Sequence, residues 1–150
     1  MTVIFSKKCE LGLQAVLYLS TLTAGDRVSA TQVAEKLKVP KEFVSKVMQI
    51  LTESGIVASK KGKNGGFALG RKASEIKLID IVIVLDGPEV FNSCVLGFPG
   101  CSVATPCPMH EEWGKIRNTA FNMLSTETLE SLKIKSINKI ESLKSQSSFL

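Results

Sequence analysis

Apolar residues recur at helical spacing along most of the chain, and this pattern predicts a mainly α-helical protein. The first helix is expected from Lys7 to Thr23, and Gly25-Asp26 should end it. This helix carries apolar residues on two sides rather than in one stripe. A helix of that kind is buried on two sides, so we expect it at the centre of the fold.

Two short helices joined by a tight turn are predicted next. Ser29 and Gln32 form a capping box at the start of the first, with the Ser29 side chain as the cap. Pro40 suits the first position of the second helix, and Gly55 suits the left-handed position that ends it. This order of elements is typical of a helix-turn-helix.

A glycine-rich hairpin is expected directly after these helices. Residues 56–60 and 67–69 have the composition of strands, and the segment KGKNGG between them contains Asn-Gly and Gly-Gly turn signals. A helix-turn-helix followed by a basic hairpin is a winged helix-turn-helix. The predicted fold class is therefore mainly α with a small β-hairpin, followed by a long dimerisation helix.

The second half of the chain combines helices with one long loop. Residues 78–85 are rich in Val and Ile, as in a buried strand, but the spacing of Leu78, Ile81 and Leu85 favours a helix. Residues 88–108 contain four prolines and are expected to form a loop, and a loop of this length is usually functional. We divide the chain into a DNA-binding domain, 1–72, and a loop-and-dimerisation part, 73–150.

The long helix should start near Pro108 and cover 109–124. Its apolar stripe comprises Trp113, Ile116, Ala120 and Leu124, widened by Phe121 and Met123. A further helix is expected to begin near Thr126-Glu127-Thr128 and to carry Leu129 and Leu132, and the polar stretch 145–148 is expected to fray.

The net charge of +5 is unevenly distributed. Residues 1–72 hold 12 Lys/Arg against 5 Asp/Glu, whereas residues 73–150 hold 7 against 9. A basic half joined to a mildly acidic half suits a polyanion-binding module with a separate control module. The chain lacks an apolar run long enough to cross a membrane and a secretory leader, so we expect a cytoplasmic protein with no membrane partner.

Double-stranded DNA is the expected polyanion, because the second helix of a helix-turn-helix enters the major groove. On that helix Ser45 and Gln49 can bind base edges, whereas Lys41 and Lys46 suit phosphates. The glycine-thinned hairpin is narrow enough for a minor groove. The full set of expected DNA-contacting residues is Ser29, Thr31, Lys41, Glu42, Ser45, Lys46, Gln49, Lys60, Lys61, Lys63 and Asn64.

A homodimer is expected because one such domain reads only about one half-site of an operator. The long helix 109–124 is the best dimer element, and the alternative is that its apolar stripe packs within one chain.

Three of the four cysteines lie within fourteen residues, in the arrangement Cys94-x6-Cys101-x5-Cys107-x2-His110. These gaps are wider than those of structural zinc sites and suit an iron–sulfur cluster, either [2Fe-2S] or [4Fe-4S]. A disulfide framework is not expected in the cytoplasm. Three cysteines leave one ligand to find, and the candidates are His110, Glu10 and Cys9.

The chain resembles the family of dimeric winged-helix regulators that includes IscR, NsrR and RirA. The resemblance covers roughly residues 1–132 and depends on the segments SKKCELGLQAVLYLS, SATQVAEKLKVPKEFVSKVMQIL, SKKGKNGGFALGR, EIKLIDIVIVLDG and CPMHEEW. It implies a DNA-binding homodimer that represses or activates transcription, with a cluster held by Cys94, Cys101 and Cys107. It also implies a fourth ligand at His110 or at Glu10 of the partner subunit, and control by iron, cluster supply, nitric oxide or redox state.

Two positions depart from the family pattern. The gap between Cys94 and Cys101 is one residue longer than usual, and Ser45 stands where IscR has a Glu. Three alternatives to a cluster-sensing regulator are also open: a regulator of the same fold that uses zinc or thiol oxidation, a structural DNA-binding protein without a signal, and a thiol enzyme. The thiol enzyme would use Cys107 as nucleophile and His110 as base, but no oxyanion-hole motif accompanies them, so we expect no enzyme.

Overall fold

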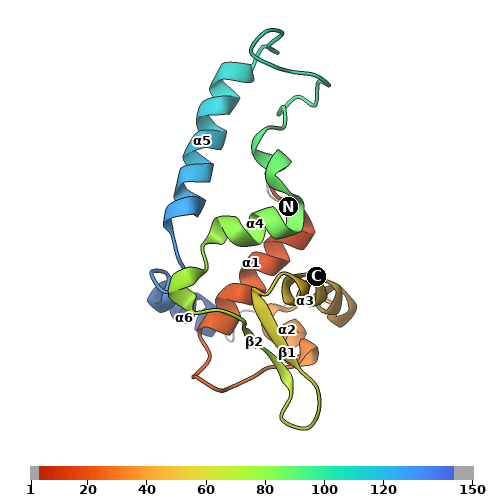
Figure 1. Cartoon of the computed structure of the whole chain (residues 1–150), viewed down its shortest axis with the longest axis vertical. Helices are drawn as coiled ribbons and strands as arrows, with labels where there is room; N and C mark the ends of the chain where they lie inside the picture. Colours follow the sequence, from red (N-terminus) through yellow and green to blue (C-terminus); the bar gives the residue numbers. More distant parts are fainter. Residues whose placement is uncertain (1–3, 144–150) are drawn as a thin grey trace.

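The computed structural model describes residues 4–143, and three helices form its base (Figure 1). These are α1 (Lys7–Ser20), α2 (Ala30–Leu37) and α3 (Lys41–Glu53). The predicted capping box is present, because the Ser29 hydroxyl accepts from the Gln32 N–H and the Gln32 side chain accepts from the Ser29 N–H. Two expected bounds were wrong: α1 ends three residues before Thr23, and Pro40 precedes α3 as its cap instead of opening it.

The predicted hairpin is formed by β1 (Val57–Lys60) and β2 (Gly66–Leu69), which pair antiparallel. Residue 28 pairs with β2 as well: the N–H of Val28 donates to the carbonyl of Phe67, and the N–H of Phe67 donates back. Gly66 has a φ of +123°, and a Cβ there would lie 2.7 Å from the Val28 carbonyl oxygen. Only glycine therefore allows the wing to lie this close to the segment that leads into α2.

The helical interpretation of residues 78–85 is confirmed, because α4 covers Leu78–Asp86. It crosses α1 so closely that a Cβ on Gly12 would overlap the Leu85 side chain. At its carboxyl end Asp86 accepts hydrogen bonds from the Ser6 backbone and hydroxyl. These contacts confirm the central position predicted for α1, because this helix packs on α3 and α6 as well as on α4.

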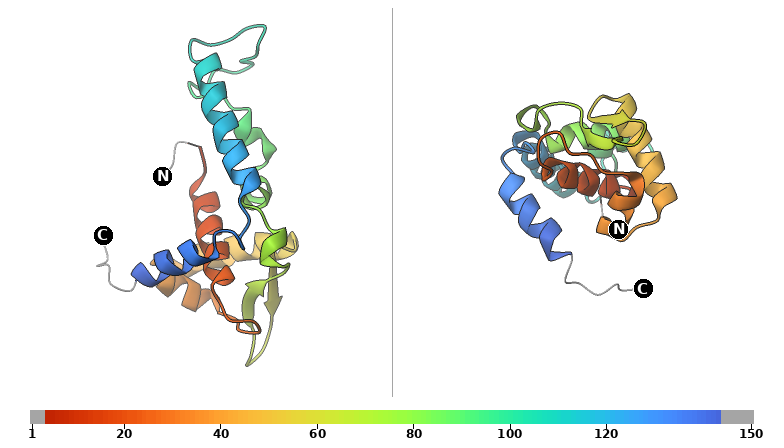
Figure 2. Two further views of the ribbon diagram at one scale, coloured as in Figure 1. Left: turned by 90° about the vertical axis from the view of Figure 1, so that its left-hand side faces the viewer. Right: turned by 90° about the horizontal axis from the view of Figure 1, so that it is seen from below.

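Helix α5 (His110–Thr126) rises away from this base, and the long loop before it folds back along its side (Figure 2, left). Two short 3-10 turns, Ala73–Glu75 and Pro88–Phe91, flank α4. The apolar stripe of α5 is divided: Leu124 is buried in the core, but Ile116 is 55% exposed and Met123 57% exposed. Phe121 contacts the ring of Phe91 edge to face, with the centroids 5.2 Å apart.

The last described helix, α6 (Lys133–Ser142), begins later than the Thr126–Thr128 start that was predicted. The intervening residues make reciprocal side-chain bonds instead: the Ser131 hydroxyl accepts from the Thr128 N–H, and the Thr128 hydroxyl accepts from the Ser131 N–H. Such bonds offer the backbone an alternative to a helix. Leu129 is nevertheless buried, and its N–H donates to the Ile76 carbonyl.

One hydrophobic core joins α1, α3 and α4 with Leu124 and Leu129, so it draws on both predicted parts of the chain. Within residues 4–143 no helix is both long and apolar enough to cross a membrane. The expected fraying of residues 145–148 lies outside the described residues.

Candidate functional site

Helix α3 lies next to the hairpin at the base of the molecule (Figure 1). Its inner positions Val44, Val47, Met48 and Leu51 are buried in the core. The five residues expected to contact DNA are all exposed on the opposite side: Lys41, Glu42, Ser45, Lys46 and Gln49. The amphipathic pattern therefore placed the outer face of this helix correctly.

The expected contacts on α2 and the hairpin are exposed too. Ser29 and Thr31 lie at the start of α2, where the Ser29 hydroxyl is already engaged by the cap. Exposed positions on and around the hairpin turn are Lys60, Lys61, Lys63 and Asn64. Together with α3 they make a face that is rich in lysine, with Glu42 as an exception.

Sequence reasoning missed Arg27, which joins the wing to the helices. This half-buried side chain donates to the carbonyl of Gly66, 3.3 Å away, and more weakly to that of Ala58, 3.5 Å away. A lone arginine between α1 and α2 gives no sequence signal for such a role. It holds both strands of the hairpin against the segment that precedes α2.

The three clustered cysteines converge, although they are spread over fourteen residues of loop. The Sγ atoms of Cys94, Cys101 and Cys107 all lie within 4.8 Å of one another, and we call these three residues the thiol site. The Cys94 and Cys107 sulfurs are 3.4 Å apart, and the backbone N–H of Cys107 donates to the Cys101 sulfur over 3.4 Å. Each side chain is half-buried, so the site is accessible from solvent.

The thiols of Cys94 and Cys107 differ in acidity. Desolvation raises the pKa of Cys94, but hydrogen bonds from the Phe98 backbone and the Cys107 thiol outweigh it and lower that pKa to about 7. Desolvation, together with the hydrogen bond to Cys94, raises the pKa of Cys107 above its ordinary value. At neutral pH the pair therefore combines a partly ionised thiol at Cys94 with a protonated thiol at Cys107.

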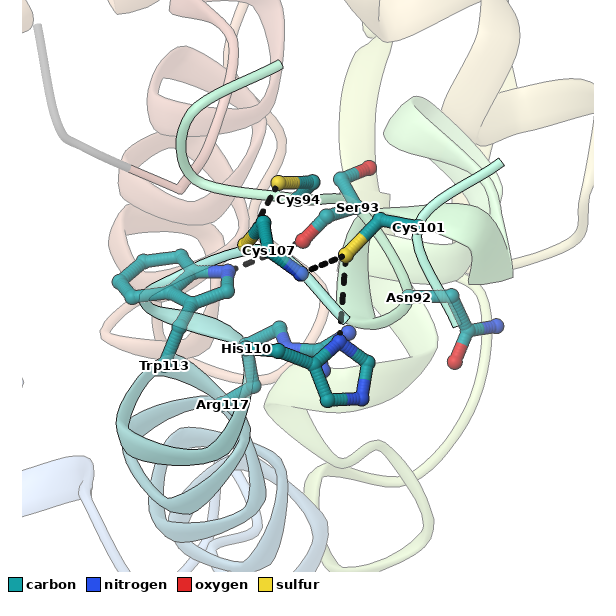
Figure 3. Close-up of a pocket in the computed structure, with 8 residues that line it drawn as sticks. All are labelled: Asn92, Ser93, Cys94, Cys101, Cys107, His110, Trp113 and Arg117. Atoms are coloured by element: carbon teal, nitrogen blue, oxygen red, sulfur yellow. Dashed lines mark hydrogen bonds between the residues drawn. The ribbon is translucent and has the colours of Figure 1, made fainter. Parts of the chain in front are cut away.

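His110 is the one histidine in the sequence, and it lies beside the thiol site at the start of α5 (Figure 3). Its Nδ1 is 3.2 Å from the Cys101 sulfur. The thiol-enzyme alternative required this ring to serve Cys107, but the ring contacts Cys101 instead.

Two further residues of α5, Trp113 and Arg117, line the same pocket together with Asn92 and Ser93. The indole N–H of Trp113 donates to the Ser93 carbonyl, and the Arg117 guanidinium donates to the Phe91 carbonyl. The sequence analysis assigned Trp113 to the apolar stripe of the expected dimer helix. In the structure its side chain is half-buried and bonded to the loop of its own chain.

Cys9 and Glu10 are not part of the thiol site in this chain. Cys9 is fully buried in the core, where burial and then the charge of Asp86 raise the pKa of its thiol to about 12. Glu10 lines a groove with Val39 and Phe43 between α1 and α3, and it pairs with Lys7 at 3.6 Å. Of the three candidates for a fourth ligand, only His110 lies next to the thiols of its own chain.

The donor set fits a thiophilic metal. A tetrahedral ion with metal–sulfur bonds of about 2.3 Å holds its sulfurs roughly 3.8 Å apart, similar to the spacing of these thiols. An iron–sulfur cluster distributes its thiolate ligands over two or more iron atoms, so thiolates bound to different irons lie further apart. The intervening segment has no regular structure and contains Gly97 and Gly100 at positive φ, so the loop can widen without breaking a helix or strand.

Comparison with known proteins places these features in one family. The profile of the Rrf2 family, described as iron-dependent transcriptional regulators, matches residues 5–134. An HTH-type transcriptional regulator of Aquifex aeolicus is 30% identical over 131 residues, covering 86% of this chain and 90% of the relative.

Solved structures share the fold. CymR, the global cysteine regulator of B. subtilis, is 27% identical with a TM-score of 0.72, covering 87% of this chain and 96% of its own. IscR of T. potens is 24% identical with a TM-score of 0.65, covering 96% and 92%, and at this identity it supports the fold alone.

Proposed function

Because the chain belongs to the Rrf2 family of transcriptional regulators, we propose that an iron–sulfur cluster at the thiol site controls how tightly it binds DNA. The convergence of three thiol sulfurs within 4.8 Å is the observation that carries this proposal. The local conformational preferences of an exposed loop give no reason for three cysteine side chains to meet. A soft metal centre, in contrast, requires several thiolates at one point. The family's description as iron-dependent supports iron over other metals.

DNA binding is assigned to the lysine-rich face of α3 and the hairpin. The exposed end of α3 can enter a major groove, with Ser45 and Gln49 at base edges and Lys41 and Lys46 at phosphates. Lys60, Lys61 and Lys63 on the glycine-thinned wing suit the adjacent backbone and minor groove. The acidic Glu42 opposes phosphate contact and instead suits the amino group of a cytosine.

Iron at the thiol site would be held by Cys94, Cys101 and Cys107. His110 is the proposed fourth ligand, because its Nδ1 lies beside the Cys101 sulfur. Glu10 could complete the site only from a second copy of the chain, since it faces α3 in its own. When bound, the cluster supplies an iron centre that oxygen, nitric oxide or iron shortage can remove.

A homodimer is part of the proposal, because two half-sites give an operator its specificity. Ile116, Phe121 and Met123 leave apolar surface uncovered on α5. A cluster held by Cys94, Cys101 and Cys107 would tie together the loop that adjoins this helix, and would so change how the two DNA-binding domains of the dimer are set relative to DNA. A 5- to 150-fold change in affinity requires a coupling of only about 1–3 kcal/mol.

Anaerobic purification tests the proposal directly. We expect a coloured protein with bound iron and sulfide, and a change in DNA affinity when the iron is removed. Cys101→Ser should lose both colour and response, whereas the buried Cys9→Ala should keep both. A colourless, iron-free protein that binds DNA equally well before and after oxidants contradicts the proposal.

Thiol oxidation without a metal is the second candidate, and the 3.4 Å separation of the Cys94 and Cys107 sulfurs favours it. The two candidates differ in metal content: an oxidation sensor responds to a disulfide reagent when free of iron and of zinc. Metal analysis of the responding protein therefore separates them.

A further inference from the structure

Three side chains on one face of α5 each contact the cysteine loop. His110, Trp113 and Arg117 follow one another at spacings of three and four residues, which places them on the same side of the helix. His110 contacts the Cys101 sulfur and Trp113 donates to the Ser93 carbonyl (Figure 3). Arg117 donates to the Phe91 carbonyl. These three side chains thus contact the thiol site at one end of the row and the start of the loop at the other.

The two carbonyls that accept these hydrogen bonds lie one and three residues before Cys94. The Trp113 Nε1 is 2.9 Å from the Ser93 oxygen, and an Arg117 nitrogen is 2.6 Å from the Phe91 oxygen. Edge-to-face contact between the rings of Phe91 and Phe121 adds an apolar anchor to the same helix. The segment that carries Cys94 is therefore fixed to α5 at three positions, from Trp113 to Phe121.

The other two thiols are fixed to the first turn. The His110 backbone N–H donates to the Cys107 carbonyl over 3.1 Å, and the Cys107 N–H in turn donates to the Cys101 sulfur. In contrast, the middle of the loop is exposed, with Phe98 57% and Val103 88% accessible. The two limbs that bear cysteines are held by α5, and the tip between them is not.

We propose that Trp113 and Arg117 are positioning residues of the thiol site: they hold the Cys94 limb against α5 and so link the site to that helix. The inference depends on the proposed function in so far as the site holds a metal. Groups that orient ligands without touching the metal commonly change its affinity 10- to 100-fold when they are removed. Here the two donors act through backbone carbonyls one and three residues before the ligand.

A second observation supports Arg117. Its Nε is buried and, among the described residues, has no hydrogen-bond partner, although the guanidinium lines the thiol pocket. An unsatisfied buried donor is costly, and an anionic group in the pocket would offset that cost. Three thiolates around a metal form such an anionic group, so arginine suits the position better than a neutral residue of equal length.

The test compares Trp113→Phe, which keeps an aromatic ring but removes the N–H, with Arg117→Met and Arg117→Lys. Asn118→Ala, on an exposed part of α5, is the matched control. Metal-free proteins are treated with iodoacetamide, and the rate at Cys94 is read by mass spectrometry. We expect Cys94 to react several-fold faster in Trp113→Phe and Arg117→Met than in the wild-type and control proteins.

The same proteins are then titrated with Co²⁺ alone, whose visible absorption reports thiolate ligation. Trp113→Phe and Arg117→Met should bind Co²⁺ roughly 10-fold or more weakly, and Arg117→Lys should recover part of the loss. Unchanged alkylation rates and unchanged Co²⁺ affinity in both variants would overturn the inference. If the wild-type protein binds neither Co²⁺ nor iron, the metal proposal fails, and the alkylation rates still decide whether these residues hold Cys94.

Discussion

The sulfur atoms of Cys94 and Cys107 lie 3.4 Å apart, although twelve residues of loop separate them in the chain. This contact brings the two cysteine limbs of the loop together at the amino end of α5. It also places a thiol with a lowered pKa next to one with a raised pKa.

The first prediction concerns the metal-free protein under oxidation by glutathione disulfide. The Cys94 thiolate attacks one sulfur of the reagent and releases a glutathione thiolate, which can take up the proton of the Cys107 thiol. The Cys107 thiolate then attacks the Cys94 sulfur of the mixed disulfide and releases the second glutathione. We expect a Cys94–Cys107 disulfide as the main product by peptide mapping. Cys101→Ser should leave this product intact, and a main product joined through Cys101 would contradict the prediction.

The reactivity of the same two thiols should separate with pH. Because hydrogen bonds lower the pKa of Cys94 to about 7, its alkylation rate in the metal-free protein should reach half its maximum near pH 7 and decline below it. Cys107, whose pKa is raised, should become reactive only at pH above the ordinary 9.0. Iodoacetamide labelling resolved by residue measures both curves, and coincident curves near pH 9 are the opposing result.

How much of this site the sequence could predict depends on the range of the interactions. The capping box at Ser29 and the glycine-rich turn between β1 and β2 depend on local interactions, and the sequence predicts both. The donor–acceptor pairs of Trp113 and Arg117 with the loop were missed, because the path of a loop without regular structure is set by tertiary contacts. Cys9 lies on α1, and the sequence does not show that its thiol is buried in the core, outside the thiol site.

Cys9→Ala should separate stability from metal binding. The side chain is fully buried between α1 and its neighbours, so removing its sulfur leaves a small cavity that costs about 1 kcal/mol of unfolding free energy. Iron per subunit should not change, because Cys9 lies outside the thiol site. Urea denaturation measures the unfolding free energy, and iron analysis measures the iron per subunit. Cys101→Ser is expected to do the reverse: it should lose iron and keep the unfolding free energy of the metal-free protein.

The crossing of α1 and α4 predicts a large effect of one methyl group. In Gly12→Ala the new Cβ overlaps the buried Leu85 side chain, which must leave its position or push the helices apart, at a cost of about 1–3 kcal/mol. Gly114→Ala on α5 is the control, since the new Cβ would lie 3.6 Å from an Arg117 guanidinium nitrogen, which is ordinary van der Waals contact. Replacing that helical glycine should raise stability by about 0.5–1 kcal/mol, so the two melting temperatures should move in opposite directions.

Phosphate contact and base contact on the DNA face can be distinguished by their salt and sequence dependence. Lys63 lies exposed at the tip of the wing, so Lys63→Ala should weaken binding to all sequences and reduce the slope of log K against log salt by about 1. Gln49 is exposed on α3, where its amide can pair with an adenine. Gln49→Ala should therefore cost about 1–3 kcal/mol on a selected operator and little on random DNA.

Fluorescence anisotropy on an operator obtained by selection from random DNA, repeated over a salt series, measures both quantities. Lys115→Ala is the matched control, because its exposed ion pair with Glu112 on α5 is remote from the wing and contributes little to stability. If Lys63→Ala and Lys115→Ala change the salt slope equally, the wing does not contact phosphate. If Gln49→Ala weakens binding to operator and random DNA alike, α3 does not read bases through this residue, and the specificity must come from other positions on the same face.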